Sequence, residues 1–362
     1  MIFCEKCFLD GEIIPIIHEC DEIGECQICY SKDVYIYDTD KNDKLINLFE
    51  DFISIFTPAQ LLPDAFPKSE IKMLKSELFT NWNIFNQRTE SEIYSIVTEV
   101  CKERYECNPE IFDNPVGLKE LYETDYLEEH SLLTTKTWEG FVESLKSKNR
   151  FHTHYINLQL LDKFCSYIRK PYKKGTLFYR GRISDESGYL KDDMGAPPND
   201  RASEGRANAN GISCLYVADS IETTLHEVRA GAFDYVSIGT FELLEDIIVV
   251  DLKRINVISP FIYGLDYREH AINKEHLNKI NDEMGKALRR SDSPLDYVAT
   301  QYISDFIKSR ERDNKAVYAG VEYKSVMNET GYNLAIFDEC LFKCTDVEVY
   351  AIKNITYNKQ KV

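Results

Sequence analysis

The sequence lacks long hydrophobic runs, which excludes a membrane-spanning segment. Its longest apolar stretches, such as DIIVVDL at residues 246–252, are far shorter than the roughly 20 residues that cross a bilayer. The first residues, MIFCEKCFLDGEI, contain neither the basic segment nor the apolar segment of a secretory signal peptide. We therefore expect a soluble, cytoplasmic protein that is neither secreted nor inserted into a membrane.

Positive charge is also scarce. The chain has 43 Lys and Arg residues against 61 Asp and Glu residues, and its formal net charge is −18 at pH 7. A field of this sign repels polyanions, so we do not expect general binding to DNA or RNA. A small anionic substrate is compatible with this charge if a few arginines converge on one site.

Long low-complexity linkers and internal repeats are absent as well, so domain borders rest on changes in residue pattern. The 362 residues are enough for two or three domains. We predict a zinc-ribbon-like segment at 1–40, a mostly helical domain at 41–170 and a catalytic domain of mixed α/β pattern at 171–362. Because several strand-like segments of the last domain follow one another without a helix between them, the predicted fold class is α+β.

What the sequence does contain is a cluster of cysteines at its N-terminus. Five of the 11 cysteines lie within the first 29 residues, and four of them follow the pattern C-x2-C-x18-C-x2-C. In a chain without an export signal, this indicates metal ligation rather than a disulfide framework. The alternative is a cysteine-rich strand pair without a metal, in which four thiols have no ligand function. The predicted ligands of a structural zinc ion are Cys4, Cys7, Cys26 and Cys29.

The most informative segment is GRANANGISCLYVADSIETTLHEV, residues 205–228. It is typical of a strand that leads into a helix, and Asp219 with Glu222 has the spacing of a capping box. Glu227 lies at the border of the apolar helix face, where a carboxylate needs an arginine or a ligand hydroxyl as partner. Tyr216 lies near the strand end, where α/β sheets tend to bind ligands.

Arginines near this segment supply local positive charge. Arg206 precedes a loop in which Gly211 lets the backbone approach a ligand closely. Arg180 and Arg182 alternate with apolar residues on one face of a strand and form a second positive centre. The alternative for each arginine is a surface ion pair in an acidic protein.

The loop in YKSVMNETGYNLAIFD, residues 323–338, supplies small polar groups. Ser325 and Asn328 precede the turn at Gly331, and a hydroxyl there can hydrogen-bond a substrate. Stabilisation of the turn is the alternative explanation.

Five separated blocks of the chain resemble the RES domain family in their order: LFYRGR, MGAPP, GRANANGISCLYVADSIETTLHEVR, DYVATQYISDFIKS and YKSVMNETGYNLAIFD. The resemblance covers roughly residues 172–340. Members have an arginine, a tyrosine and a glutamate spaced ten and eleven residues apart, followed far downstream by a serine. Arg206, Tyr216 and Glu227 reproduce both intervals, and Ser325 stands in the matching serine block. Where many members have Arg-Trp-Asn this chain has Arg-Ala-Asn, so the tryptophan contact is missing.

The resemblance implies a fold related to ADP-ribosyltransferases and an NAD-degrading enzyme of the kind found in RES–Xre toxin–antitoxin pairs. Such an enzyme cleaves the N-glycosidic bond between nicotinamide and ribose, with phosphate (NAD+ phosphorylase) or water (NAD+ glycohydrolase) as acceptor. NAD is then a substrate and not a retained cofactor. The implied roles are phosphate binding by Arg206 with Arg180 or Arg182, contact with the ribose by Tyr216 and Glu227, and a hydrogen bond to substrate or acceptor from Ser325.

Two alternatives use the same residues. One is ADP-ribose transfer to a protein or small molecule, and the other is a non-catalytic module that senses NAD or ADP-ribose while the ribbon reads a partner. The N-terminal arrangement also resembles RES proteins that carry a HEPN-like domain. The Arg-x4-6-His signature of active HEPN ribonucleases is not evident in this region, so the resemblance does not extend to RNase activity. An antitoxin or regulatory protein is the expected partner.

Overall fold

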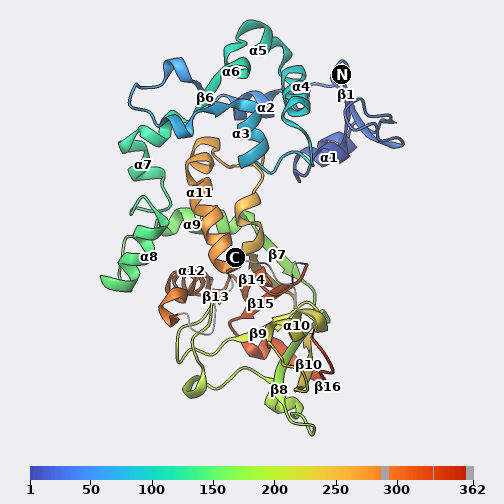
Figure 1. The fold of residues 1–362 in the computed structure, drawn as a ribbon, viewed down its shortest axis with the longest axis vertical. Coiled ribbons are helices and arrows are strands. Elements are labelled where there is room, and N and C mark those ends of the chain that lie inside the picture. The colour runs from blue at the N-terminus through green and yellow to red at the C-terminus, as the bar shows by residue number, and fades with distance from the viewer. Residues whose placement is uncertain (287–292, 329, 356–362) are drawn as a thin grey trace. The chain divides into compact units, whose positions relative to one another are not determined.

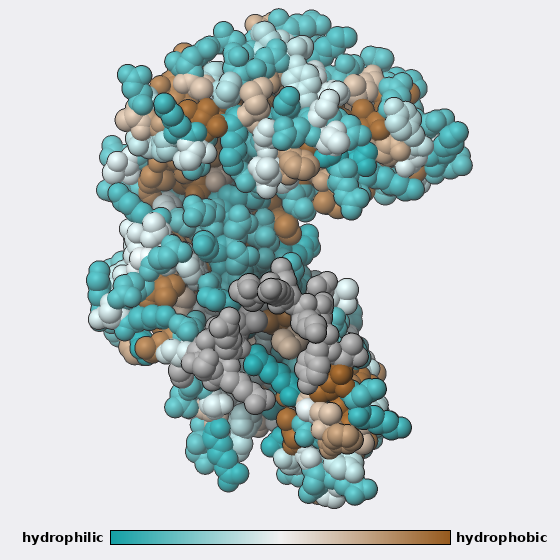
Figure 2. Space-filling view, viewed as in Figure 1, coloured by the Kyte–Doolittle hydropathy of each residue, from teal (hydrophilic) through white to brown (hydrophobic). Residues whose placement is uncertain are grey.

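The computed structural model describes residues 1–286, 293–328 and 330–355 (Figure 1). On the face drawn in Figure 2, hydrophilic residues predominate and hydrophobic residues form small separate groups, as the strongly charged composition requires. Within the described part of the chain, none of the helices combines the length and the apolar character that a membrane-spanning helix needs.

The chain folds into two compact units. The first consists of Met1–Ser131 with Val257–Glu275, and the second of Leu132–Asn256 with His276–Val362. Helix α11, Tyr267–Met284, contributes its first residues to one unit and its last residues to the other. The predicted division into three domains, at 1–40, 41–170 and 171–362, stays a prediction, because two compact units do not test those borders.

The first unit begins with a small sheet of order β1-β3-β2, followed by helices and a second three-stranded sheet of order β4-β6-β5. Helix α4 begins with a capping box, in which Thr89 and Glu92 satisfy each other's backbone N–H groups. The elements of this unit besides α11 are β1 Ile2–Cys4, α1 Ile13–His18, β2 Ile23–Gly24, β3 Val34–Asp38, α2 Ile46–Ile53, β4 Thr57–Pro58, β5 Lys72–Met73, α3 Leu74–Asn81, α4 Glu90–Val100, α5 Lys102–Cys107, α6 Glu110–Asp113, β6 Pro115–Gly117 and α7 Thr124–His130.

One hydrophobic core joins the cysteine-rich sheet to the helices of the first unit. Phe3 of β1 packs on Tyr37 of β3 with ring centroids 5.2 Å apart, and Phe8 contacts Phe85 at 5.3 Å. Phe49 of α2 belongs to the same cluster of buried residues. The cysteine-rich sheet therefore shares its hydrophobic core with the helices and has no separate core of its own.

The second unit is built on an eight-stranded sheet of order β16-β10-β8-β9-β15-β14-β11-β7. Strand pairs are antiparallel except β11 and β14, which confirms the mixed α/β architecture. In Figure 1 the green and yellow strands lie beside the red ones, so strands far apart in sequence are neighbours. The elements are α8 Trp138–Ser147, α9 Leu158–Tyr167, β7 Arg169–Tyr172, β8 Leu177–Ser184, β9 Leu215–Ala218, α10 Ile221–Glu227, β10 Tyr235–Leu243, β11 Ile247–Asp251, α12 Val298–Lys308, β12 Glu311–Arg312, β13 Lys315–Ala316, β14 Gly320–Lys324, β15 Tyr332–Ile336 and β16 Phe342–Ala351.

The two faces of this sheet carry different side chains. Residues that lie opposite each other on neighbouring strands point to the same face. The pairs Tyr179–Ala218, Ala218–Asn333 and Asn333–Tyr323 therefore form one row across β8, β9, β15 and β14, here called the polar-row face. The opposite face, here called the core face, holds a cluster of buried apolar residues that includes Phe178, Leu215, Val217, Leu334 and Ile336.

Helix α10 packs on the polar-row face close to β8. A Cβ atom on Gly181 would lie 2.7 Å from Thr224 Cγ2 of α10, so the missing side chain permits this close approach. The expected capping box of Asp219 and Glu222 is wrong by one residue. Ser220 is the N-cap, and its Oγ accepts a hydrogen bond from Thr223 N at 3.1 Å. Asp219 instead accepts from the backbone of β15, because the strand ladder extends to that residue.

Candidate functional site

The four predicted cysteine ligands meet in the first unit. Cys4 Sγ lies 4.0 Å from Cys7 Sγ and 3.4 Å from Cys29 Sγ, and Cys7 Sγ lies 3.6 Å from Cys26 Sγ. All four sulfur atoms are within 4.8 Å of one another. A tetrahedral ion with metal–sulfur bonds of about 2.3 Å has sulfur–sulfur edges of about 3.8 Å, so the quartet fits a metal site.

The surroundings of Cys26 suit anionic sulfur. The backbone N–H groups of Ile28 and Cys29 donate to Cys26 Sγ at 3.4 Å. Hydrogen bonds from the thiols of Cys4 and Cys7 lower the pKa of Cys26. A thiolate is the ligand form that metals bind, and these donors favour it at Cys26. The hydrogen bonds to Cys26 in turn raise the pKa of Cys4 and Cys7.

In the second unit, the Glu227 carboxylate is held by two donors. Ser325 Oγ donates to Glu227 Oε1 at 2.6 Å, and Asn333 Nδ2 donates to the same oxygen at 2.9 Å. Glu227 is an exposed residue, whereas Ser325 and Asn333 are only 7% and 5% exposed. The carboxylate therefore sits at the surface of a site whose supporting groups are buried.

Tyr216 and Arg206 lie together on the polar-row face. The Tyr216 hydroxyl donates to Asn208 Oδ1 at 2.6 Å and accepts from Ala207 N at 3.1 Å, which ties it to the loop that carries Arg206. Burial, followed by the nearby Cys214, raises the pKa of Tyr216 well above its usual range. The phenol therefore stays neutral at physiological pH.

The Arg206 guanidinium donates to backbone carbonyls at the end of α11. The distances are 2.7 Å to Glu283 O, 2.6 Å to Met284 O and 2.6 Å to Lys286 O. The last carbonyls of a helix lack partners within it and carry partial negative charge, so an arginine here is stabilising.

Tyr323 lies between the Glu227 carboxylate with its donors and the pair formed by Arg206 and Tyr216. Its ring centroid lies 5.7 Å from the Arg206 guanidinium carbon, and the ring shares the polar-row face with Asn333. Burial raises the pKa of Tyr323, while the charge of Arg206 lowers it and the charge of Glu227 raises it. Arg206, Tyr216 and Glu227 thus all interact electrostatically with one buried tyrosine, and Ser325 joins the cluster through Glu227.

The structure does not bring Arg180 and Arg182 to this cluster. Arg180 lies opposite Gly239 on β10, and both belong to the core face, with Met194 nearby. Arg180 Nη1 donates to the backbone oxygen of Tyr216 at 3.1 Å. Arg182 points the same way, with its guanidinium 4.1 Å from the centroid of the Tyr189 ring. The alternation of side chains along β8 therefore separates both arginines from Arg206.

Burial, and then the charge of Arg182, lower the pKa of Arg180. Its Nε–H is buried and has no hydrogen-bond partner among the described residues. The charges of Cys214 and Glu339 also act on it, and both of these residues line a cavity.

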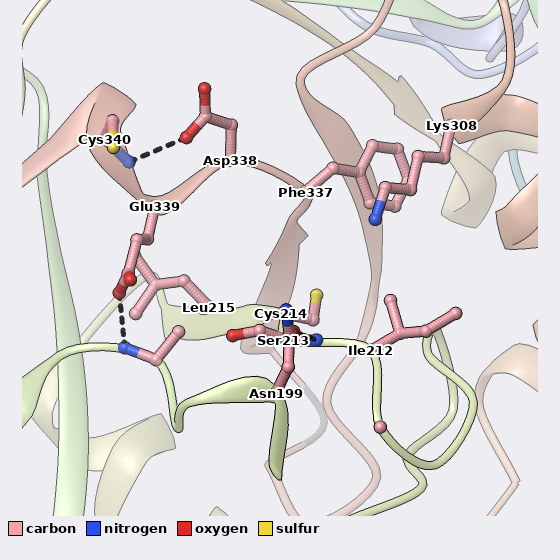
Figure 3. A pocket seen from close by; sticks show the side chains of 12 residues that line it. Asn199, Ile212, Ser213, Cys214, Leu215, Lys308, Phe337, Asp338, Glu339 and Cys340 are labelled. Carbon is pink, nitrogen blue, oxygen red and sulfur yellow. Dashed lines mark hydrogen bonds between the residues drawn. The ribbon is translucent and has the colours of Figure 1, made fainter. Parts of the chain in front are cut away.

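This cavity is drawn in Figure 3, and its lining includes residues just before β9 and just after β15. It therefore lies at the end of these strands opposite to the Ala218–Asn333 pair. Its volume is about 500 Å³, and Gly211 contributes to its wall with a φ of +81°. Its lining combines charged groups such as Lys308 and Asp338 with apolar ones such as Phe337. The full lining consists of Ala196, Asn199, Gly211, Ile212, Ser213, Cys214, Leu215, Lys308, Phe337, Asp338, Glu339 and Cys340.

The remaining predicted binding residue, Asn328, supports the loop that holds Ser325. Asn328 Nδ2 donates to Thr223 Oγ1 of α10 at 3.0 Å, and its backbone N–H donates to Ser325 Oγ at 3.2 Å. Asn328, Arg180, Arg182 and Gly211 stay predicted substrate-binding residues.

Two residues of the cluster, Asn333 and Tyr323, were not predicted from the sequence. Both lie in the block 323–338, and Asn333 stands in a strand, YNLAI, whose other residues are apolar or aromatic. A polar residue within such a strand is a signal for a buried hydrogen bond, but its partner depends on strand order, which the sequence does not display.

A family model for the RES domain matches residues 179–357, which include Arg206, Tyr216, Glu227 and Ser325. No curated protein and no solved structure matches the chain.

Proposed function

Because residues 179–357 form a RES domain, a family associated with NAD-related toxin activity, we propose that this protein degrades NAD by cleaving the bond between nicotinamide and ribose. Phosphate or water takes up the ADP-ribosyl group. The observation that carries the proposal is the Glu227 carboxylate, which two buried donors hold on the sheet face that also carries Tyr216 and Tyr323.

The chemistry suits a single carboxylate. Nicotinamide leaves as a neutral group, so the reaction needs no strong general acid. The transition state resembles an oxocarbenium ion, and an anion that faces the ribose stabilises its positive charge. Glu227 Oε1 accepts two hydrogen bonds, so Oε2 is the atom proposed to meet the ribose hydroxyls. Neutral Tyr216 is proposed to orient the same ribose.

Arg206 is proposed to bind phosphate without leaving α11. A guanidinium has five N–H groups, and the three bonds to backbone carbonyls use three of them. The Nε–H and one Nη2–H remain for phosphate oxygens. One side chain can thus position the end of α11 and attract the diphosphate of NAD.

We propose zinc as the metal of the cysteine quartet. Four thiolates at tetrahedral distances are the usual ligand set of a structural zinc site. With four protein ligands no position is left for substrate, so the ion supports the fold of the ribbon and takes no part in the reaction.

The biological role proposed for this protein rests on its RES domain alone. A RES enzyme that consumes NAD acts as a toxin or defence effector in the cytoplasm, and an antitoxin or regulatory protein restrains it. The relation to ADP-ribosyltransferase folds and the HEPN-like character of the helical region belong to the same proposal.

The test is incubation of the purified protein with labelled NAD, with and without phosphate, followed by identification of products. We expect ADP-ribose 1″-phosphate or ADP-ribose together with free nicotinamide. Label on protein supports ADP-ribosyl transfer instead, and binding of NAD without consumption supports sensing.

The matched variants for this assay are Glu227→Gln and Glu222→Gln, two residues of the same helix. We expect Glu227→Gln to lose NAD turnover by about 100-fold or more, as for loss of an electrostatic stabiliser. Glu222 is exposed and pairs with His226 at 3.1 Å, so its variant should retain activity. Full turnover in a folded Glu227→Gln protein would overturn the site assignment.

A further inference from the structure

Glu227 stands at a position that is unfavourable for a carboxylate. It is the last residue of the short helix α10, where the free carbonyl groups carry partial negative charge. An exposed glutamate side chain at such a place samples several rotamers. A fixed carboxylate there requires donors from outside the helix, and β15 and the loop before it supply them.

The two donors differ in how rigidly they are held. Ser325 lies in the loop after β14, and its Oγ accepts hydrogen bonds from Met327 N at 3.3 Å and Asn328 N at 3.2 Å. With both lone pairs engaged, its proton is left for Glu227. Asn333 lies within β15, paired with Ala218 on one side and Tyr323 on the other. Its Cβ position is therefore set by two strand ladders.

The chemistry of the contact also settles the orientation of the Asn333 amide. An ionised carboxylate accepts hydrogen bonds only, so the amide nitrogen, and not the oxygen, faces Glu227. Asn333 is 5% exposed, so it does not reach bulk solvent or a substrate in the way that Glu227 does.

We infer that Asn333 is a positioning residue of the NAD-cleaving site, which fixes the Glu227 carboxylate so that Oε2 faces the substrate. This inference rests on the proposed function. Asn333 acts through Glu227, and it supplies the only contact to that carboxylate, among those within the described residues, that comes from a sheet strand. Sites supported by strands are more exact than sites supported by loops.

The test compares Asn333→Asp with Asn333→Leu. Both substitutions keep the approximate size and remove the donor. We expect kcat to fall about 100-fold at pH 8 in both, because a displaced catalytic group costs about that factor, while KM changes by less than about threefold.

The pH dependence of kcat distinguishes a positioning role of Asn333 from a purely structural one. In Asn333→Asp the introduced carboxyl group gains a proton as the pH falls, since two adjacent carboxylates share one proton readily. Its O–H then donates to Glu227 again, so the ratio of variant to wild-type kcat should rise between pH 8 and pH 5. Asn333→Leu has no such proton and should show a constant ratio.

The control is Asn157→Asp, the same substitution in the same unit. Asn157 caps α9 by accepting from Leu160 N at 3.1 Å, and aspartate caps a helix equally well. This variant should match the wild type at every pH. Wild-type kcat in both Asn333 variants, or parallel losses of both at every pH, would overturn the inference.

Failure of the proposed function is a separate outcome. If the wild type consumes no NAD, the proposed reaction fails, and crystal structures of the wild type and Asn333→Leu decide the positioning role. A Glu227 carboxylate that moves away from Ser325 in the variant supports that role, and an unmoved carboxylate contradicts it.

Discussion

The cysteine quartet of the first unit and the Glu227 cluster of the second unit both join groups from separate chain segments, but over very different sequence distances. The thiols that meet lie within 25 positions of one another. Ser325 and Asn333 lie 98 and 106 positions from Glu227. The quartet can be predicted from spacing within one small module, whereas the cluster depends on which strands become neighbours in a large sheet.

The two regions also differ in what stabilises them. The ribbon shares the hydrophobic core of the first unit, and metal binding to its four thiols would add folding free energy directly. The Glu227 cluster rests on a sheet whose core face is packed with apolar residues. We therefore expect substitutions at the quartet to act on stability, and substitutions at the cluster to act mainly on activity.

The largest effect is expected at the quartet. Cys7→Ser should release the metal and unfold the ribbon, since the free energy of zinc binding is on the order of 10 kcal/mol and is coupled to folding. Metal content by elemental analysis and thermal unfolding measure this. Cys20→Ser is the matched control, because Cys20 Sγ donates to Ile16 O and lies outside the quartet. Equal metal content in both variants would contradict the assignment of ligands.

The next largest effect on stability is expected at a second glutamate, Glu322, which lies on the core face of the sheet. Glu322 is fully buried and accepts hydrogen bonds from Lys170 Nζ at 2.8 Å and Tyr172 OH at 2.6 Å, with Lys253 Nζ also in contact. Glu322→Gln should lower the free energy of unfolding by about 3 kcal/mol, because two ammonium groups lose their anion.

Urea unfolding of Glu322→Gln beside Glu227→Gln sharpens the difference between the two carboxylates. We expect Glu227→Gln to stay within about 1 kcal/mol of the wild type, since Glu227 is an exposed residue. Greater destabilisation by Glu227→Gln than by Glu322→Gln would reverse the roles assigned to the two sheet faces.

A smaller effect on the free energy of unfolding is expected at Arg206. This residue is expected to contribute both to stability and to activity. Arg206→Ala should abolish NAD turnover and also lower the free energy of unfolding by about 2 kcal/mol, because three carbonyls at the end of α11 lose a charged donor. Urea unfolding and an NAD assay on the same preparation measure both. A variant with unchanged stability would show that the bonds to α11 contribute little.

The smallest effect is expected at the start of α10. Ser220→Ala removes the N-cap and should cost about 1 kcal/mol in the free energy of unfolding. Thr89→Ala removes the cap of α4 in the first unit and should cost a similar amount. Only the former changes the helix that presents Glu227, so a decrease in NAD turnover is expected for Ser220→Ala alone.

Local features were predictable because their causes are local. The CxxC spacing indicated four ligands that do meet. The intervals between Arg206, Tyr216 and Glu227 pointed to the RES family, which the family model confirms. The helix start at Ser220 was misplaced by one residue, because the β15 ladder engages Asp219 and leaves the cap to its neighbour.

Features that depend on the sheet were not predictable. The sequence did not indicate a special role for Asn333. Its hydrogen bond to Glu227 depends on the position of β15 between β9 and β14 in the sheet. Arg180 and Arg182 appeared to be partners of Arg206, but alternation along β8 directs them to the core face.

The sequence by itself thus indicated the RES family and the four cysteines that meet at a possible metal site. The candidate carboxylate follows from the resemblance to that family, because Glu227 reproduces its residue intervals. The tertiary structure alone decided which donors hold that carboxylate and which arginines share its side of the sheet. Strand order depends on ladders between distant chain segments, such as β9 with β15. The side of the sheet depends on that order together with the alternation of side chains along β8.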